Sequence, residues 1–201
     1  MRKALLHLKK ADPVMAGLID RIGPYAIEYL EPGYVSLAKA IVYQQLSGKV
    51  AETIFRRLAG ATGDGRLTPE ATLKLSPARL RELGLSKQKI AYLRDLAQRT
   101  LSGSLDFAAL RRLPDRLVYQ RLTALKGIGP WTVQMFLIFA LRRPNVLPSA
   151  DLGIRAAVQK AYGFAELPTP RQIEELARPW RPYCTVASWY LWRSLEEKAG
   201  L

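Results

Sequence analysis

Apolar residues recur at the spacing of an α-helix along almost the whole chain. One set comprises Leu37, Ile41, Val42 and Leu46, and a similar set lies between residues 93 and 101. No convincing run of alternating apolar and polar residues marks a β-sheet, and no repeat of fixed period or low-complexity tract is present. The pattern therefore predicts an all-helical fold.

Proline and glycine divide this helical pattern. The breaks fall at 23–24, 32–33, 60–69, 84, 103, 114, 127–130, 144–148, 168–170 and 179–182. They leave roughly nine or ten helices of ordinary length. We expect one unit over residues 1–201, built of two helical lobes that flank a cleft. Lobe A covers about 35–140 and includes the turn at 125–132, and lobe B covers about 1–34 plus 145–201.

Composition points to a globular protein with a polyanionic partner. The chain has 201 residues, of which 49% are hydrophobic, and this is ample for a packed core. Thirty-one Lys and Arg residues face 17 Asp and Glu residues, which gives a formal charge of +14. Such a balance favours association with nucleic acid first and with an acidic membrane second.

Several classes of protein are disfavoured by what the sequence lacks. No apolar stretch approaches the length that crosses a bilayer, and the first residues are too briefly apolar for a secretory signal. We therefore expect an intracellular protein. Cys184 is the only cysteine and His7 the only histidine, so a disulfide, a four-cysteine iron–sulfur cluster and a zinc site are not expected. Catalysis would then rely on carboxylates, hydroxyls, lysines or aromatic side chains.

The segment from Leu125 to Thr132 has the form of a turn that grips phosphate. Gly127 and Gly129 are one residue apart, and both can adopt backbone angles closed to other residues. The chain can then turn tightly and direct successive N–H groups outward from the start of the next helix. Amides of this kind bind phosphate oxygens and read no base identity, so the segment predicts contact with a nucleic-acid backbone.

Asp151 follows this turn and has two interpretations. It precedes a helical pattern that begins at Ile154, and aspartate is a favoured N-cap whose charge suits the positive end of a helix. The same helix end would also keep the carboxylate ionised, ready to face positive charge on a sugar or to orient a water. The two roles are compatible.

Aromatic residues are concentrated between positions 179 and 193. Core packing is the default role of an aromatic residue on a helix. Trp189 and Trp192 are neighbours on one helix face, and with Trp131 they could form a slot of the size of a base. Aromatic faces attract cations, so such a slot would favour a base that carries positive charge.

Two polar segments are further candidates for contact with DNA. Gln44-Gln45-Leu46-Ser47 ends or interrupts a helix directly after an apolar run, although a Gln-Gln pair on a solvated face would be unremarkable. Gly84-Leu85-Ser86-Lys87-Gln88-Lys89 is more specific, because it reads as a glycine stop, a serine cap and two lysines in the first helical turn. Lysines oppose the helix dipole there unless an anion lies close, so we interpret Ser86, Lys87 and Lys89 as a second phosphate contact.

These segments together resemble the helix-hairpin-helix (HhH-GPD) DNA glycosylase superfamily, and in particular its 3-methyladenine DNA glycosylase II (AlkA-like) branch. The resemblance covers nearly the whole chain and includes the order and spacing of its motifs. The hairpin alone occurs in many DNA-binding proteins, but its combination with a downstream aspartate and a Trp-Arg-Pro-Tyr segment is specific. The matching residues are 40–47, 84–89, 125–132, 148–151 and 179–183.

The resemblance implies roles for individual residues. Asp151 matches the essential catalytic aspartate of the family. Trp131 stands where bifunctional relatives carry a lysine nucleophile, so a monofunctional enzyme without AP-lyase activity is implied. Trp131 and Trp189 match residues that line the base pocket. Met135 stands where a tyrosine is often found, and Leu152 follows the catalytic aspartate where an aromatic residue can occur.

The resemblance also implies contacts with DNA and with an ion. Gly127, Ile128, Gly129 and Thr132 of the hairpin, together with Gln45, Leu46 and Ser47, would bind DNA. Family hairpins often hold a structural Na⁺ or K⁺ through backbone carbonyls, which here are those of Thr123, Leu125 and Ile128. No other cofactor is implied. Some members have an additional N-terminal domain, which we do not expect here. Leu46 and the loop 62–67 are candidates for the side chain that fills the gap left by an extruded base.

The activity implied is excision of alkylated purines, such as 3-methyladenine and 7-methylguanine, from double-stranded DNA in base excision repair. We expect a monomer without a membrane partner. One alternative is a helix-hairpin-helix glycosylase for deaminated, oxidised or mismatched bases. The missing iron–sulfur cysteines and the missing hairpin lysine disfavour it. The other is a non-catalytic module that binds bent or damaged DNA.

Overall fold

A computed structural model describes residues 1–63 and 65–196. This part of the chain forms thirteen α-helices and one 3-10 helix, and it contains no β-strand, which confirms the predicted all-helical class. Nine or ten helices is too low a number, because three helices are only six residues long and too short to show a helical period. Within the described residues, no helix is long and apolar enough to cross a membrane.

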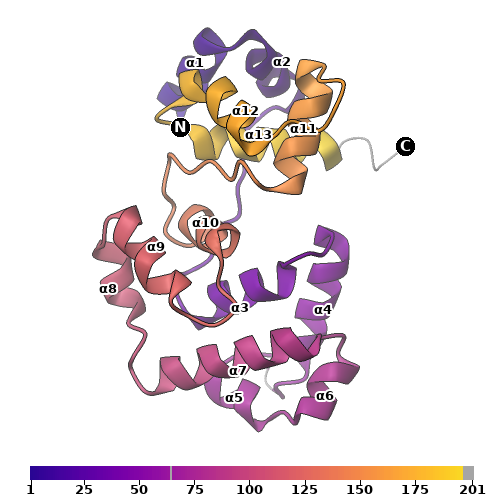
Figure 1. Cartoon of the computed structure of the whole chain (residues 1–201), viewed down its shortest axis with the longest axis vertical. Coiled ribbons are helices and arrows are strands. Elements are labelled where there is room, and N and C mark those ends of the chain that lie inside the picture. Colours follow the sequence, from indigo (N-terminus) through magenta and orange to yellow (C-terminus); the bar gives the residue numbers. More distant parts are fainter. Residues whose placement is uncertain (64, 197–201) are drawn as a thin grey trace. The chain divides into compact units, whose positions relative to one another are not determined.

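The chain divides into two compact units at 28/29 and 141/142. Unit 1 joins the N-terminal residues 1–28 to the segment that begins at Arg142, and unit 2 is the continuous segment Tyr29–Leu141 (Figure 1). The helices of unit 1 are α1 (Arg2–Ala11), α2 (Pro13–Ile22), α11 (Leu152–Tyr162), α12 (Pro170–Leu176), the 3-10 helix η1 (Arg178–Trp180) and α13 (Cys184–Glu196).

The core of unit 1 forms around α13, which packs against α1, α2 and α11. Trp180 and Tyr190 are fully buried there, together with Leu8 and Met15 of the first two helices. Most of the aromatic side chains between 179 and 193 therefore stabilise the packing of α1 and α2 against the C-terminal helices of unit 1. Burying an aromatic side chain removes a large apolar area from water.

Asp12 ties the N-terminal helices to this core. Its Oδ1 accepts the N–H groups of Val14 and Met15 at 2.9 and 3.0 Å and so caps α2. Its Oδ2 accepts the hydroxyl of Tyr162 at 2.7 Å and the indole N–H of Trp180 at 2.8 Å. A carboxylate that is only 7% exposed needs such donors, because an unsatisfied buried charge is strongly unfavourable. Burial, with Asp12 beside it, also raises the pKa of Tyr162.

The helices of unit 2 surround α3, whose residues are mostly buried. This helix packs against α4, α7 and α10, which explains the apolar run at 40–42. The helices are α3 (Tyr34–Tyr43), α4 (Gly48–Gly60), α5 (Pro69–Lys74), α6 (Pro77–Glu82), α7 (Lys87–Leu101), α8 (Phe107–Arg112), α9 (Asp115–Thr123) and α10 (Pro130–Phe139).

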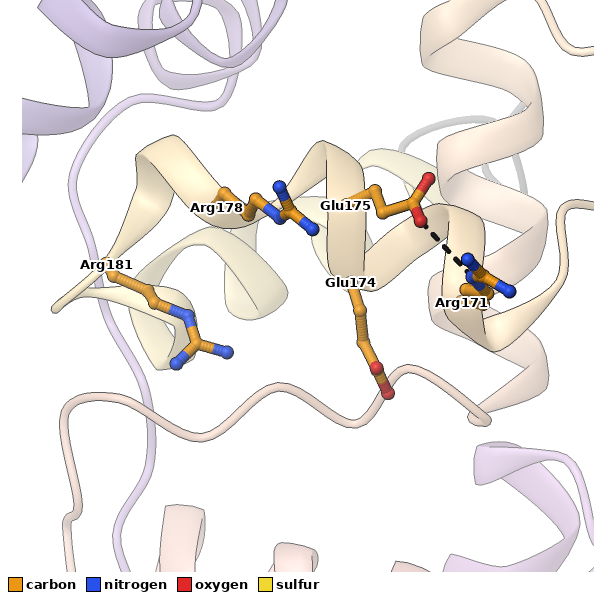
Figure 2. Close-up of a pocket in the computed structure, with 5 residues that line it drawn as sticks. All are labelled: Arg171, Glu174, Glu175, Arg178 and Arg181. Atoms are coloured by element: carbon orange, nitrogen blue, oxygen red, sulfur yellow. Dashed lines mark hydrogen bonds and ion pairs between the residues drawn. The ribbon is translucent and has the colours of Figure 1, made fainter.

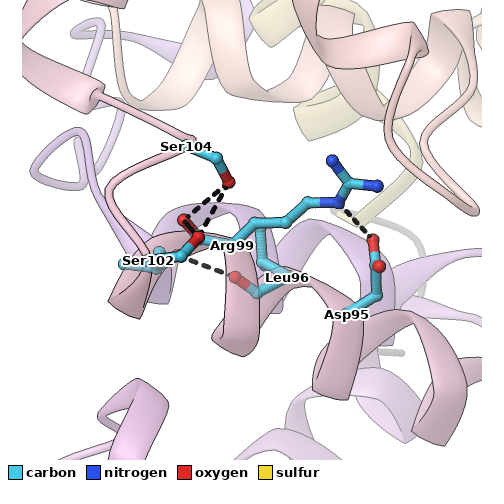
Figure 3. A network of polar contacts seen from close by, with 6 residues as sticks. Asp95, Leu96, Arg99, Ser102 and Ser104 are labelled. Carbon is cyan, nitrogen blue, oxygen red and sulfur yellow. Dashed lines mark hydrogen bonds and ion pairs between the residues drawn. The ribbon is translucent and has the colours of Figure 1, made fainter.

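The helix α7 is the longest of unit 2, and side chains close its C-terminal end. The hydroxyls of Ser102 and Ser104 both donate to the carbonyl of Arg99, at 3.2 and 3.1 Å (Figure 3). The Arg99 side chain in turn pairs with Asp95, one turn earlier, at 2.9 Å. These contacts satisfy a carbonyl that the helix itself leaves without a partner, so α7 ends firmly before α8.

An ionic cluster links α3 to α4 across the turn at 44–47. Glu52 of α4 accepts the hydroxyl of Tyr43 and pairs with Arg56 at 2.9 Å and with Lys39 at 3.2 Å. The hydrogen bond from Tyr43, with smaller help from the two cations, lowers the pKa of Glu52 from its ordinary 4.5 to about 2. The cluster therefore contributes stability above pH 4.5, and this contribution is lost as the pH falls toward 2.

Glu52→Gln should make this pH dependence visible. The variant should unfold more readily than the wild type at pH 5, and the difference between their free energies of unfolding should shrink as the pH is lowered to 2. Urea titrations of both proteins at a series of pH values measure it. If the difference in the free energy of unfolding stays constant over this range, the charge of Glu52 does not stabilise the link between α3 and α4.

Candidate functional site

Asp151 is the N-cap of α11. Its Oδ1 accepts the N–H of Ile154 at 2.9 Å, and its own N–H donates to the carbonyl of Pro148 at 3.0 Å. Ser149, two residues before Asp151, is buried, and its hydroxyl donates to Glu174 at 2.8 Å. The cap interpretation is thus confirmed, and the half-buried carboxylate is fixed from both sides. Its catalytic role stays a prediction.

Trp192 contacts the Asp151 carboxylate. Its indole N–H donates to Asp151 Oδ1 at 2.9 Å. A Cβ atom on Gly153 would lie 3.1 Å from both Asp151 Oδ1 and Trp192 Cδ1, so glycine leaves the room that this pair needs. The sequence places Trp192 only on an aromatic helix face. Its bond to Asp151 spans 41 residues, and no local pattern predicts it.

Trp189, the other tryptophan of that face, lies in the core of unit 1. It is 8% exposed and packs edge-on against Tyr25 and Tyr190, with ring centroids 4.9 and 4.8 Å apart. The guanidinium of Arg193 lies 6.0 Å from the Trp189 ring centroid, which is within the range of a cation–π contact. The predicted contact of Trp189 with a base stays a prediction, and packing accounts for much of its surface.

A charged hollow lies on α12 and η1, near the loop that leads to Asp151 (Figure 2). Its volume is about 410 Å³. Glu175 pairs with Arg171 at 3.3 Å, and Glu174 holds the Ser149 hydroxyl. The lining consists entirely of charged side chains, namely Arg171, Glu174, Glu175, Arg178 and Arg181. A base needs flat apolar walls, so this hollow is not a base pocket.

In unit 2, α9 and α10 form a helical hairpin around Gly127. This residue has φ of 77°, which favours glycine, and a Cβ atom here would overlap the ring of Tyr92 of α7. The N–H of Ile128 donates to the carbonyl of Leu125 at 3.2 Å and closes the turn. Ile128 itself is buried. The first glycine of the hairpin is therefore required by the fold.

Gly129 differs from Gly127, and our expectation of special backbone angles at both glycines is wrong. It has φ of −96° and ψ of 178°, which any residue can adopt, and a Cβ atom would meet no atom within 4 Å. Gly129 is the N-cap of α10 and makes no side-chain cap. The first N–H groups of a helix lack intrahelical partners, so this end is open to an anion that approaches the bare backbone closely.

Gln44 joins the turn between α3 and α4 to the hairpin. Its Nε2 donates to the carbonyl of Gly127 and to the hydroxyl of Thr132, both at 2.8 Å. Thr132 is buried, and its hydroxyl is hydrogen-bonded within the protein. The next residues, Gln45, Leu46 and Ser47, are exposed, and Leu46 has 37% of its surface accessible. Through Gln44, which the predicted site omits, the structure brings together two of the three predicted DNA-contacting segments of unit 2, the turn at 44–47 and the hairpin.

The segment 84–89 has the predicted local structure. Gly84 has φ of 102°, and the hydroxyl of Ser86 caps α7 by accepting the N–H of Lys89 at 3.2 Å. Lys87 is exposed. The side chain of Lys89 turns inward and donates to the carbonyls of Val42 and Gln44, each at 2.8 Å. Burial lowers the pKa of Lys89.

The remaining predicted residues are distributed over both units. Trp131 is half-buried in the first turn of α10, and Met135, one turn later, is 8% exposed. Leu152 is the first residue of α11 and is 67% exposed. A helical spacing of four places Trp131 and Met135 on one face of α10. Their predicted contacts with a base stay predictions.

The predicted cation site consists of the backbone carbonyls of Thr123, Leu125 and Ile128, and it stays a prediction. The carbonyl of Leu125 accepts the N–H of Ile128 at 3.2 Å. The described residues contain no cluster of His, Cys, Asp or Glu side chains suited to a metal. Neutral carbonyl oxygens suit a monovalent cation in general, since they can replace its water shell.

The helical hairpin of unit 2 and the capped aspartate that follows it define a protein of the helix-hairpin-helix class. The sequence matches the HhH-GPD superfamily of base excision DNA repair proteins over residues 38–182. This match covers well over half of the chain, so the protein belongs to the HhH-GPD superfamily. The resemblance inferred from the sequence motifs is confirmed.

Two relatives of this chain are 3-methyladenine DNA glycosylases by name. DNA-3-methyladenine glycosylase 1 of Schizosaccharomyces pombe is 34% identical over 200 residues, which cover 96% of this chain and 87% of that protein. The putative DNA-3-methyladenine glycosylase YfjP of Bacillus subtilis is 34% identical over 169 residues, which cover 81% of this chain and 59% of that protein.

Solved structures agree with these sequence matches. The S. pombe 3-methyladenine DNA glycosylase in complex with abasic DNA superposes with a TM-score of 0.92 at 34% identity, and the match covers 96% of this chain and 97% of that one. The 3-methyladenine DNA glycosylase from Archaeoglobus fulgidus has a TM-score of 0.78 at 27% identity, and the match covers 100% of this chain and 75% of that one.

Proposed function

We propose that the protein is a DNA glycosylase that removes alkylated purines of the 3-methyladenine and 7-methylguanine type from double-stranded DNA in base excision repair. The observation that carries this proposal is the near full-length similarity to a 3-methyladenine DNA glycosylase. The charge of +14 and the open N-terminus of α10 support DNA as the partner. The protein acts as a monomer inside the cell.

Asp151 is the catalytic residue in this proposal. Alkylation at N3 or N7 leaves the purine cationic, so the base takes the bonding electrons and departs as a neutral molecule without a general acid. The sugar is left as an oxocarbenium-like cation, and the Asp151 carboxylate stabilises it electrostatically. A water then adds its hydroxyl to C1′ and releases a proton, which leaves an abasic site. Asp151 also orients this water.

The absence of a lysine at position 131 supports a monofunctional enzyme. A lysine amine can form a Schiff base with the opened sugar, whereas an indole cannot. Trp131 and Met135 are the proposed contacts of the base in unit 2, and Trp189 and Leu152 are those in unit 1. Their aromatic and soft apolar surfaces favour a cationic base over a neutral one.

Contacts with the DNA backbone come from unit 2. The hairpin turn of Gly127, Ile128 and Gly129 brings the bare backbone of its glycines to one phosphate, and a Na⁺ or K⁺ on the carbonyls of 123, 125 and 128 adds positive charge there. Ser86 and Lys87 at the start of α7 meet a second phosphate. The exposed Gln45, Leu46 and Ser47 enter the duplex, and Leu46 fills the gap that the extruded base leaves.

A panel of defined duplexes tests the lesion class. Each duplex carries one 7-methylguanine, uracil or 8-oxoguanine, and base release is followed with and without alkali. We expect release from the 7-methylguanine duplex alone, with strand cleavage only after alkali. Release from the uracil or 8-oxoguanine duplex only would favour the alternative glycosylase. Cleavage without alkali would show a lyase activity.

Two matched variants test the partner of the catalytic carboxylate. Trp192→Phe keeps an aromatic ring and removes the N–H that donates to Asp151. Because a hydrogen bond to a charged group is worth about 1.5–3 kcal/mol, we expect the single-turnover rate of base release to fall about tenfold or more. The melting temperature should change little, because Trp192 is only half-buried.

Trp180→Phe is the control for this experiment. It also removes an indole–carboxylate hydrogen bond, but that bond joins the buried Asp12 in the core of unit 1. We expect this variant to lose stability and to release base at the rate of the wild type. Equal rate losses in the two variants would mean that Trp192 acts only through the fold.

A further inference from the structure

The turn at 44–47 is closed from the side by a lysine of α7. The last turn of an α-helix leaves carbonyls without intrahelical partners. At the end of α3 the carbonyls of Ile41 and Tyr43 accept backbone N–H groups of the turn, at 3.3 Å each. Lys89 Nζ donates to the two carbonyls between and after them, those of Val42 and Gln44, at 2.8 Å each. Lys89 thus completes the hydrogen bonding of this helix end.

The backbone that Lys89 holds is strained at the next residue. Gln45 has φ of 57°, in the left-handed region where helix ends usually carry glycine. A glutamine persists there only if the surrounding structure holds it. Lys89 binds the carbonyl that directly precedes Gln45, and it places a cation at the negative end of α3. The backbone that carries the exposed residues 45–47 is thereby tied to α7.

The helix α7 also supports the hairpin. Tyr92, a neighbour of Lys89 on the same face of α7, packs against the bare backbone of Gly127. Gln44, whose carbonyl binds Lys89, sends its own amide to Gly127 and Thr132. Lys89 and Tyr92, three positions apart on α7, therefore set the turn at 44–47 and the hairpin in a fixed register within unit 2.

We propose that Lys89 is a positioning residue, which fixes the turn at 44–47 against the hairpin through the carbonyls of Val42 and Gln44 and does not itself bind phosphate. This replaces the phosphate contact that the sequence predicts for Lys89, and it rests on the glycosylase function proposed above. The inward side chain is half-buried, whereas Lys87, two residues earlier, is exposed. The two lysines of one helical turn then have different tasks.

Three single substitutions on α7 separate these tasks. Lys89→Met removes the donor that holds the turn. Lys87→Met removes the exposed lysine. Arg94→Met is the matched structural control, because Arg94 also closes another helix end, with hydrogen bonds of 3.3 and 3.2 Å to the carbonyls of Leu73 and Leu75. For each protein we would measure the melting temperature, the DNA dissociation constant at several salt concentrations, and the single-turnover rate of 7-methylguanine release at saturating enzyme.

We expect Lys89→Met to lower the saturating rate about tenfold or more while the salt dependence of binding stays that of the wild type. Lys87→Met should reduce the magnitude of the slope of log K against log salt by about one. Arg94→Met should lower only the melting temperature. Lys89→Arg, which keeps the donors, should recover part of the lost rate.

Two results would overturn the proposal. A salt slope reduced by about one in Lys89→Met, with an unchanged saturating rate, would make Lys89 a phosphate contact. A loss of melting temperature alone, as in Arg94→Met, would make it merely structural. If Lys89→Met does not fold, Gln44→Leu removes the side-chain contact of the turn with the hairpin, and the proposal predicts the same loss of rate. The fluorescence of 2-aminopurine beside the lesion reports base extrusion independently of base release. If the wild type extrudes the base but does not release it, the proposed function is contradicted. The difference in extrusion between the wild type and Lys89→Met then still tests the role of Lys89.

Discussion

Asp151→Asn should abolish most base release and leave the fold intact. Asparagine is as good an N-cap as aspartate, and its side-chain oxygen can still accept the N–H groups of Ile154 and Trp192. Only the negative charge is removed. Loss of one preorganised electrostatic contact with a transition state lowers rates by about 10²–10³-fold, and we expect a loss of at least this size in the single-turnover rate.

Binding measurements on the same variant distinguish an enzyme from a binding module. We expect Asp151→Asn to bind duplex DNA with a 7-methylguanine at least as tightly as the wild type, because a carboxylate near the phosphate backbone repels it. The melting temperature should match that of the wild type within a few degrees. A variant that binds as before and also releases base at the wild-type rate would remove Asp151 from the mechanism.

Alanine at the two glycines of the hairpin should lower the free energy of unfolding by very different amounts. Gly127→Ala places a methyl group in the Tyr92 ring at a residue with φ of 77°, so we expect a loss of about 2–5 kcal/mol in the free energy of unfolding. Gly129→Ala meets open space at an ordinary backbone conformation and should cost less than about 1 kcal/mol. Urea denaturation of both variants measures these values.

DNA affinity completes the comparison between the glycines. If a phosphate approaches the amides at the start of α10, the methyl group of Gly129→Ala lies in its path, and we expect affinity to fall about tenfold or more. Tyr92→Leu in the Gly127→Ala background is the control for the fold, because a smaller side chain should restore part of the lost stability. Wild-type affinity in a well-folded Gly129→Ala protein would place the phosphate elsewhere.

Local signals in the sequence predict much of this structure. The helical spacing of apolar residues gives the all-helical class, and the Ser86 and Asp151 caps lie at the starts of α7 and α11 as predicted. Such features depend on residues three or four positions apart, which the sequence shows directly. Gly129 illustrates where this fails. Gly127 needs a left-handed conformation and Gly129 does not, although the two glycines look alike in the sequence.

Contacts between distant segments are what the sequence does not reveal. Trp192 reaches Asp151 across 41 positions, and Lys89 reaches Gln44 across 45. Trp180 donates a hydrogen bond to Asp12 across 168 positions. This tryptophan of the Trp-Arg-Pro-Tyr segment therefore has a role in the core of unit 1. In each case a side chain of ordinary type finds a partner only because packing brings two helices together. A lysine on a first helical turn therefore predicts a phosphate contact, while the fold uses it to close a helix.

The most direct test of the proposed glycosylase is chromatographic identification of the bases released from methylated double-stranded DNA, with Asp151→Asn alongside the wild type. We predict that the wild type releases 3-methyladenine and 7-methylguanine and leaves abasic sites in uncut strands, and that the variant releases neither. No released base despite tight binding of the wild type to the same DNA would contradict the proposed activity and favour a module that only recognises damaged DNA.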